Sequence, residues 1–141
     1  MDDIQNFIKN HNTMTLATQG EKGVGAAAVF YAPSKEYKSL LFVSNHKSEH
    51  MINLENNNKC AVTIQEDGLE WKVIKGLQIK GTVTKAKESY WKTYFERFPY
   101  IKDDKILSNA LEKVSLYELQ ISWARLIDNE KEFGNRTEIT Y

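Results

Sequence analysis

Short stretches in which apolar and polar residues alternate, separated by turn-forming residues, constrain the fold of this chain most strongly. The clearest runs from Leu77 to Val83 and places Leu77, Ile79, Gly81 and Val83 on one face, with polar side chains between them. Strict alternation of this kind is typical of a half-buried β-strand. Further runs of strand-forming residues lie at 13–18, 24–32, 40–43, 60–65 and 116–127, so we expect six strands.

The connections between these runs are those of hairpins rather than of alternating strand and helix units. Gly20 and Gly23 separate the first two strands, and Glu66-Asp67-Gly68 marks a tight turn before the long one. Helical spacing is confined to short segments at 2–8, 48–56, 87–98 and 106–111. The apolar phase shifts near Trp123, which predicts a β-bulge. We therefore predict one mainly β (α+β) domain over residues 1–141, a six-stranded, largely antiparallel barrel with peripheral helices.

The charge balance excludes some partners. The chain carries 19 basic and 19 acidic side chains and has no net charge, so no overall field attracts nucleic acid or an anionic membrane. A single cysteine, Cys60, rules out an intrachain disulfide framework and suits a reducing compartment. The sequence shows no secretory signal pattern and no apolar run near the ~20 residues that span a bilayer. We expect a cytoplasmic protein with no nucleic-acid or membrane partner.

Polar and basic residues gather where the strand ending at Val43 leads into a helix. Ser44, Lys47, Ser48 and His50 bring hydroxyls and cations to the helix start, where backbone N–H groups and the helix dipole favour an anion. The same residues also suit an ordinary capped helix with a solvated basic edge. The pattern alone leaves both interpretations open.

The segments around this junction resemble the pyridoxamine 5'-phosphate oxidase-like, FMN-binding split-barrel family. The resemblance is carried by the residues Leu41-Phe42-Val43-Ser44, by Ser48 and His50, by the run Asn53-Leu54-Glu55-Asn56-Asn57, and by the strand from Cys60 to Ile64. The run Trp71 to Gly81 is similar to that family's next long strand. The order and spacing of the elements agree over nearly the whole chain. The resemblance implies a split β-barrel that holds FMN by its phosphate.

In the family, two hydroxyls and an Arg-Lys pair at this junction hold the FMN phosphate. The resemblance places Ser44 and Ser48 on the hydroxyls, Glu49 on the arginine and His50 on the lysine. Glu49 departs from the pattern, because a carboxylate facing a phosphate repels it. Either this side chain points away or the affinity for phosphate is lower. Lys47 and Lys75 are the cations expected to compensate.

The resemblance assigns further residues to the cofactor. It lays the isoalloxazine ring along Ala27 and Ala28, whose small side chains also suit close packing in a narrow barrel. We also expect Val43 and Gly76, which is next to Lys75, to contact the cofactor. The resemblance implies a homodimer with the flavin at the subunit interface. Arg136 is a candidate to reach the cofactor from the partner subunit, with a solvated arginine in the C-terminal segment as the alternative.

The resemblance suggests a reaction class but no substrate. The Arg-x-His pair of the pyridoxamine phosphate oxidases themselves is absent near the C-terminus, which argues against vitamin B6 oxidation. We predict an FMN-dependent oxidoreductase acting on an unknown small molecule, without assigning a catalytic residue. The alternatives are a non-catalytic binder or carrier of haem or a deazaflavin on the same scaffold, and an interaction domain without a ligand.

Three other features favour structural roles. His46 and His50 have the i, i+4 spacing of helical metal ligands but no evident third ligand, so we predict no metal site. The aromatic stripe of Tyr90, Trp91, Tyr94 and Phe95 is typical of a packed helix. Cys60 lies among apolar residues and is expected to act as a small hydrophobe.

Overall fold

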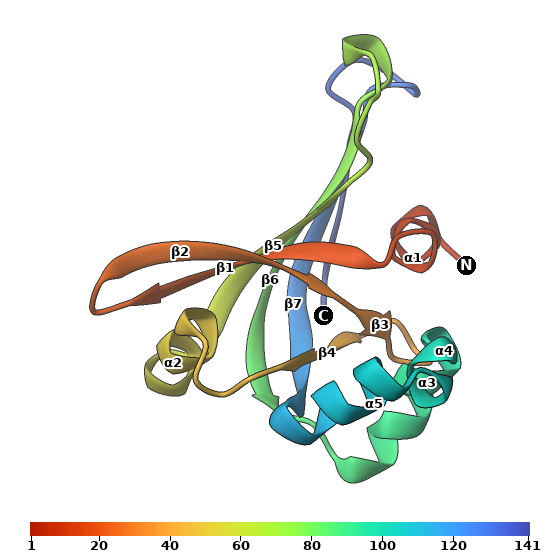
Figure 1. Ribbon diagram of the computed structural model, residues 1–141. Helices are drawn as coiled ribbons and strands as arrows, with labels where there is room; N and C mark the ends of the chain where they lie inside the picture. Colours follow the sequence, from red (N-terminus) through yellow and green to blue (C-terminus); the bar gives the residue numbers. More distant parts are fainter.

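A curled antiparallel sheet forms the body of the protein, and the computed structural model describes all of residues 1–141 (Figure 1). The strand order is β2-β1-β5-β6-β7-β4-β3, and β8 pairs with β7. Every pairing is antiparallel, and β2 contacts β4, so the two ends of the sheet approach each other. The strands are β1 (Thr13–Gly20), β2 (Gly23–Phe30), β3 (Ala32–Pro33), β4 (Ser39–Ser44), β5 (Lys59–Gln65), β6 (Lys75–Lys85), β7 (Ser115–Asp128) and β8 (Arg136–Thr140).

Short helices surround the sheet (Figure 1). Asp2 caps the first of them in a capping box with Gln5, as the acidic first turn predicts. None of the helices combines the length and the apolar composition that a membrane-spanning helix requires. The α-helices are α1 (Asp3–Lys9), α2 (Glu49–Asn56), α3 (Trp91–Arg97), α4 (Tyr100–Asp103) and α5 (Lys105–Ala110), and three 3-10 turns are η1 (Trp71–Val73), η2 (Glu88–Tyr90) and η3 (Leu111–Lys113).

The larger core fills the inside of the curled sheet. It takes alternate residues from the strands, such as Leu40 and Phe42 of β4, and is closed by α1. The buried Tyr31 hydroxyl donates to the Ile8 carbonyl at 2.7 Å and ties α1 to the strand end.

A smaller core lies on the outer side of β4, where α3 covers the sheet. Tyr94 and Phe98 pack there against Leu41 and Leu116. Arg97 fixes α3 to the N-terminal region by donating to the Lys9 and His11 carbonyls at 2.8 and 2.6 Å. The interpretation of the aromatic helix as core is confirmed.

The predicted fold class is confirmed, but the structure has eight strands rather than six. The two additions are the two-residue β3, which includes Pro33 at the sheet edge, and β8 in the C-terminal segment. Both are short and lack a clear apolar alternation, so periodicity does not reveal them. Pro33 is tolerated because an edge strand leaves one side of its backbone unpaired.

The bulge expected near Trp123 is present. Lys80 pairs with Trp123 but Gly81 pairs with Ile121, so Ser122 is the extra residue of β7. The Ser122 hydroxyl donates to the Lys80 carbonyl at 3.0 Å. Gly81 is required opposite the bulge, because a Cβ there would lie 2.4 Å from the Gln120 carbonyl oxygen.

Helix α2 lies against the β1–β2 hairpin, and this contact positions the junction that follows β4. The buried Asn53 side chain donates to the Thr18 hydroxyl at 3.1 Å. Gly20 admits it, since a Cβ at that position would lie 1.9 Å from Asn53 Oδ1. The absence of a side chain at Gly20 therefore sets how closely α2 approaches the sheet.

Candidate functional site

Three of the residues singled out from the sequence meet at the junction between β4 and α2. Ser44 Oγ lies 2.7 Å from His50 Nε2 and 3.2 Å from Ser48 Oγ, and Ser48 Oγ lies 3.3 Å from His50 Nε2. We call this group of Ser44, Ser48 and His50 the hydroxyl cradle. It joins one side chain from the strand end with two from the start of the helix.

Local geometry leaves the first turn of α2 open toward the cradle. Ser48 is the N-cap residue, yet its side chain accepts no hydrogen bond from the helix amides. Its hydroxyl instead donates to the Asn45 carbonyl at 2.7 Å, while the Asn45 side chain accepts from the Lys47 amide at 2.9 Å. The N-terminal amides of α2 therefore have no side-chain acceptor, which is the arrangement that receives an anion.

The cradle carries no positive charge of its own near neutral pH. Burial lowers the pKa of His50, and the neighbouring Glu49 carboxylate only partly opposes that shift. The imidazole is therefore neutral, and its Nε2 either accepts from or donates to the Ser44 hydroxyl. Ser44 itself is 8% exposed. The site is a set of neutral hydrogen-bonding groups in a partly desolvated position.

The two charged residues beside the cradle are turned differently. A Cβ on Gly25 of β2 would lie 3.2 Å from Glu49 Oε2, so the Glu49 carboxylate reaches over β2. Lys47 is exposed and forms no ion pair. The turn thus carries an unpaired lysine directly before Ser48 in the sequence, and Glu49 extends toward the neighbouring strand.

The residues expected to contact the flavin ring occupy the outer edge of the sheet. Ala27 is half-buried opposite Leu16, and Ala28 is exposed opposite Thr15. No residue of β2 is buried in one copy of the chain. The Val43 side chain faces the smaller core beneath α3, so only its backbone adjoins the cradle.

Lys75, Gly76 and Arg136 lie far from the cradle in one copy of the chain. Gly76 and Arg136 both pair with Ile127, near the end of β7, whereas Ser44 pairs with Ser115 at its start. At ~3.3 Å per residue, the strand between them spans about 40 Å. Lys75 instead forms an ion pair with Glu130 at 2.5 Å. The chain does not bring this second group to the cradle.

The structure gives no reactive thiol at Cys60 and no helical metal-ligand pair at His46 and His50. Burial raises the pKa of Cys60 to about 12, so its thiol stays protonated and behaves as a small apolar group. Helix α2 begins at Glu49, so His46 precedes it and does not share a helical face with His50. His46 instead lines a cavity of about 310 Å³ that also touches Met51 and Tyr117.

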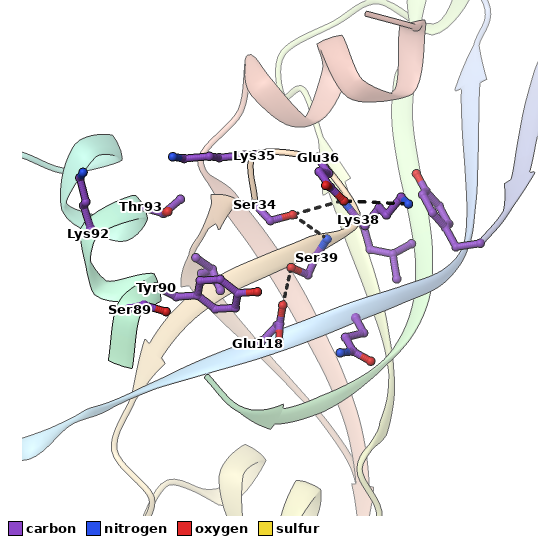
Figure 2. Close-up of a pocket in the computed structure, with 14 residues that line it drawn as sticks. Ser34, Lys35, Glu36, Lys38, Ser39, Ser89, Tyr90, Lys92, Thr93 and Glu118 are labelled. Carbon is purple, nitrogen blue, oxygen red and sulfur yellow. Dashed lines mark hydrogen bonds and ion pairs between the residues drawn. The ribbon is translucent and has the colours of Figure 1, made fainter. Parts of the chain in front are cut away.

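Sequence reasoning missed a second polar site on the other side of β4. A cavity of about 630 Å³ lies between the 34–39 turn, the start of α3 and the outer face of β4 and β7 (Figure 2). We call it the α3 cavity. Ser39 and Glu118 form its floor. Neither residue stands out in the sequence, because Ser39 is the first residue of β4 and Glu118 is a polar position in the alternation of Tyr117, Leu119 and Ile121. The lining residues also come from segments far apart in the chain.

Comparison with known proteins supplies the family. Residues 1–128 match the pyridoxamine 5'-phosphate oxidase family. The chain belongs to this family. Two UPF0306 proteins from two strains of Campylobacter jejuni are 28% identical to it over 139 residues, which cover 98% of this chain and 97% of each relative.

Solved structures of the family share the fold. ChuZ of Campylobacter jejuni superposes with a TM-score of 0.79 at 18% identity, over 98% of this chain and 58% of ChuZ. HutZ, the haem storage protein of Vibrio cholerae, superposes with a TM-score of 0.67 at 22% identity, over 84% of this chain and 87% of HutZ. The predicted split barrel of the pyridoxamine 5'-phosphate oxidase-like family is therefore confirmed.

Proposed function

We propose that this family member binds FMN, with the hydroxyl cradle around the phosphate. The observation that carries the proposal is the convergence of Ser44, Ser48 and His50 within 3.3 Å at an uncapped helix start. Hydroxyls, an imidazole and free amides are donors that a phosphate accepts from, and the helix dipole adds to them. The donor set therefore fits the phosphate group of FMN.

The residues of the chain would bind and orient, while the flavin supplies electron transfer when bound. The Ser44 hydroxyl would turn from its partners in the cradle, and the Ser48 hydroxyl from the Asn45 carbonyl, so that both donate to the phosphate. A dianion beside His50 raises the affinity of the imidazole for a proton, so we expect His50 to take up a proton when the phosphate binds. Lys47 adds a second positive charge from the turn.

A homodimer is part of the proposal, because one copy leaves the expected ring site uncovered. The edge strand β2 has no buried residue, and the ends of β6 and β7 extend from the body with Trp71 and Phe133 exposed at their tip (Figure 1). A second copy would cover such surfaces and could carry Lys75 and Arg136 to the cradle. We propose that the dimer acts in the cytoplasm as an oxidoreductase on a small molecule.

A titration with two flavins tests the phosphate contact directly. FMN and riboflavin differ only in the phosphate, so the ratio of their dissociation constants isolates the cradle. We expect Ser44→Ala/Ser48→Ala to weaken FMN binding by about 10- to 100-fold, since a hydrogen bond to a charged group contributes ~1.5–3 kcal/mol. Riboflavin binding should change little. Adding Lys47→Ala should weaken FMN binding further.

The control is Thr13→Ala, which removes an exposed hydroxyl at the far end of β1. Thermal unfolding of each variant verifies that the fold persists. An FMN dissociation constant unchanged by the double substitution would falsify the cradle as the phosphate site. Sedimentation of the FMN-loaded protein as a monomer would remove the dimer from the proposal.

Haem is the second candidate, favoured by the similarity in fold to HutZ, a haem storage protein. His46 supports it, because its exposed ring lines a cavity beside Met51 and its nitrogens have no hydrogen-bond partner in the chain. An absorption spectrum of the purified protein separates the two candidates. Flavin bands favour the first, and a Soret band that His46→Ala abolishes favours the second.

A further inference from the structure

The α3 cavity has the size and walls of a small-molecule site. Its volume of about 630 Å³ falls in the range of ligand pockets, roughly 300–1,000 Å³. Where α3 covers β4 and β7, the contact is apolar around Tyr94 and Leu116, but further along the same face it gives way to Ser39, Glu118 and Gln120. A helix that covers a sheet normally continues an apolar contact, so a polar cavity at this place is a distinct feature.

The floor of the α3 cavity is a buried hydroxyl joined to a carboxylate. Ser39 is 4% exposed, and its hydroxyl donates to Glu118 Oε2 at 2.7 Å. Figure 2 shows Tyr90 beside this pair, with its ring forming a wall. Glu118 forms no ion pair within the chain. Its other oxygen accepts no hydrogen bond from the protein, so the floor presents a free carboxylate oxygen.

The rim of the α3 cavity carries two unpaired cations. Lys38 is paired with Glu36 at 4.0 Å, whereas Lys35 on the turn and Lys92 on α3 have no acidic partner. Both ammonium groups point away from the sheet in Figure 2, on the opposite side from Glu118. The cavity therefore has a negative inner end and a positive outer end.

The turn that forms one wall is held in a single conformation before any ligand arrives. The Ser34 hydroxyl accepts from the Lys38 and Ser39 amides at 3.2 and 3.1 Å, and the Ser34 amide donates to the Ser39 carbonyl at 2.9 Å. Tyr37 adopts a φ of +59°, and its ring packs against the larger core. A non-glycine residue keeps this conformation only where its surroundings hold it, so the wall is preorganised.

We propose that the α3 cavity binds a small amphoteric molecule, with an amine or hydroxyl donating to Glu118 and a phosphate or carboxylate facing Lys35 and Lys92. Opposite charges at the two ends select a ligand with the complementary polarity over one with a single charge. The α3 cavity is separate from the hydroxyl cradle, because Ser39 and Ser44 lie on opposite faces of β4. The proposal does not depend on FMN binding.

A titration of the ¹⁵N-labelled full chain with three probes tests the proposal. Phosphoethanolamine carries both groups, whereas inorganic phosphate and ethanolamine each carry one. We expect phosphoethanolamine to bind at least about tenfold more tightly than either, shifting the amide signals of residues 34–39 and Thr93. Glu118→Gln should reduce its affinity to that of phosphate. Lys35→Gln/Lys92→Gln should reduce it to that of ethanolamine.

Glu96→Gln and Lys87→Gln are the matched controls, since both residues are exposed near α3 and neither lines the α3 cavity. Glutamine at position 118 still accepts from Ser39, which preserves the fold, and thermal unfolding verifies this. Equal affinities for phosphoethanolamine and phosphate in the unmodified chain would overturn the proposal. So would the absence of shifts at residues 34–39 at about 10 mM probe.

Discussion

The two faces of β4 carry two unlike polar sites, the hydroxyl cradle and the α3 cavity. On the inner face, Ser44 continues the row of Leu40 and Phe42 and meets only neutral partners. On the outer face, Ser39 precedes Leu41 and meets the charged Glu118. The cradle offers neutral hydrogen-bonding groups, and Lys47 is the one unpaired cation in its turn. Further charge at this site would have to come from the ligand and from a second copy of the chain. The α3 cavity already contains charges of both signs.

The comparison shows how the two-residue period of a strand lets one short strand contribute to two separate polar clusters. Because alternate residues face opposite sides, a serine at each end of β4 reaches a different compartment without disturbing the apolar residues between them. We therefore expect stability and ligand binding to be separable on this strand. Substitutions in the middle of β4 should affect the fold, and substitutions at its ends should affect one site each.

The largest expected effect contrasts Phe42 with Leu41, two neighbours that are both fully buried. Phe42→Ala should lower the free energy of unfolding by about 3–5 kcal/mol, because it opens a cavity in the 19-residue core. Leu41→Ala should cost about 2–3 kcal/mol, because the six-residue core beneath α3 can close over the gap. Urea unfolding measures both. A larger loss for Leu41→Ala would reverse the roles assigned to the two faces.

Sequence periodicity predicts most of the fold, because a strand with one buried face has apolar side chains at alternate positions. The long strand β6 and the bulge at Ser122 were both visible in this way. Strands β3 and β8 were not visible, because a short edge strand is stabilised by its neighbour's hydrogen bonds rather than by buried side chains. Periodicity therefore reveals strands that bury side chains, but not strands that are held only by backbone pairing with a neighbour.

The convergence of the cradle residues was predictable because it is local in sequence. Ser44, Ser48 and His50 lie within seven residues, and a strand followed by a helix brings them together. Lys75 and Arg136 were assigned by resemblance to the same site, yet their position depends on a second copy, which the sequence of one chain does not describe. The α3 cavity was missed because Lys35, Glu118 and Lys92 converge only through the tertiary packing of α3.

A smaller effect on stability is expected for Gly20→Ala, which tests whether the position of α2 affects the hydroxyl cradle but not the α3 cavity. A Cβ at this position would lie 1.9 Å from Asn53 Oδ1, so Gly20→Ala must displace Asn53 from Thr18 and shift α2. We expect a loss of about 1–3 kcal/mol in the free energy of unfolding, because the buried Asn53 amide loses its partner. FMN affinity should fall with it, since α2 supplies two of the three cradle residues. Phosphoethanolamine binding at the α3 cavity should stay unchanged.

Gly23→Ala provides the contrasting variant for Gly20→Ala. Gly23 has a φ of +103° and nothing within 4 Å of its added Cβ, so any loss of stability comes from backbone strain alone. It lies in the same hairpin, and a Cβ added there would meet no atom of α2. A fall in FMN affinity equal to that of Gly20→Ala would show that hairpin stability, rather than the position of α2, controls the cradle.

The smallest expected effect is the pH dependence of stability that comes from His50. Burial holds its pKa below the ordinary value of 6.5 in the folded chain, so the unfolded chain binds more protons as the pH falls below about 6.5. Its contribution to stability is therefore present above that pH and is lost on acidification. Partial exposure limits the loss to about 0.5 kcal/mol or less.

Urea unfolding of the original chain and of His50→Gln between pH 7.5 and pH 5 measures this contribution, because glutamine keeps a hydrogen-bonding side chain without a titrating group. We expect the original chain to lose stability relative to His50→Gln as the pH falls. Saturating FMN should reverse the direction, since a phosphate dianion favours the protonated imidazole and ligand binding stabilises the folded state. A pH dependence that FMN leaves unchanged would separate His50 from the phosphate and leave the cradle with its two hydroxyls alone.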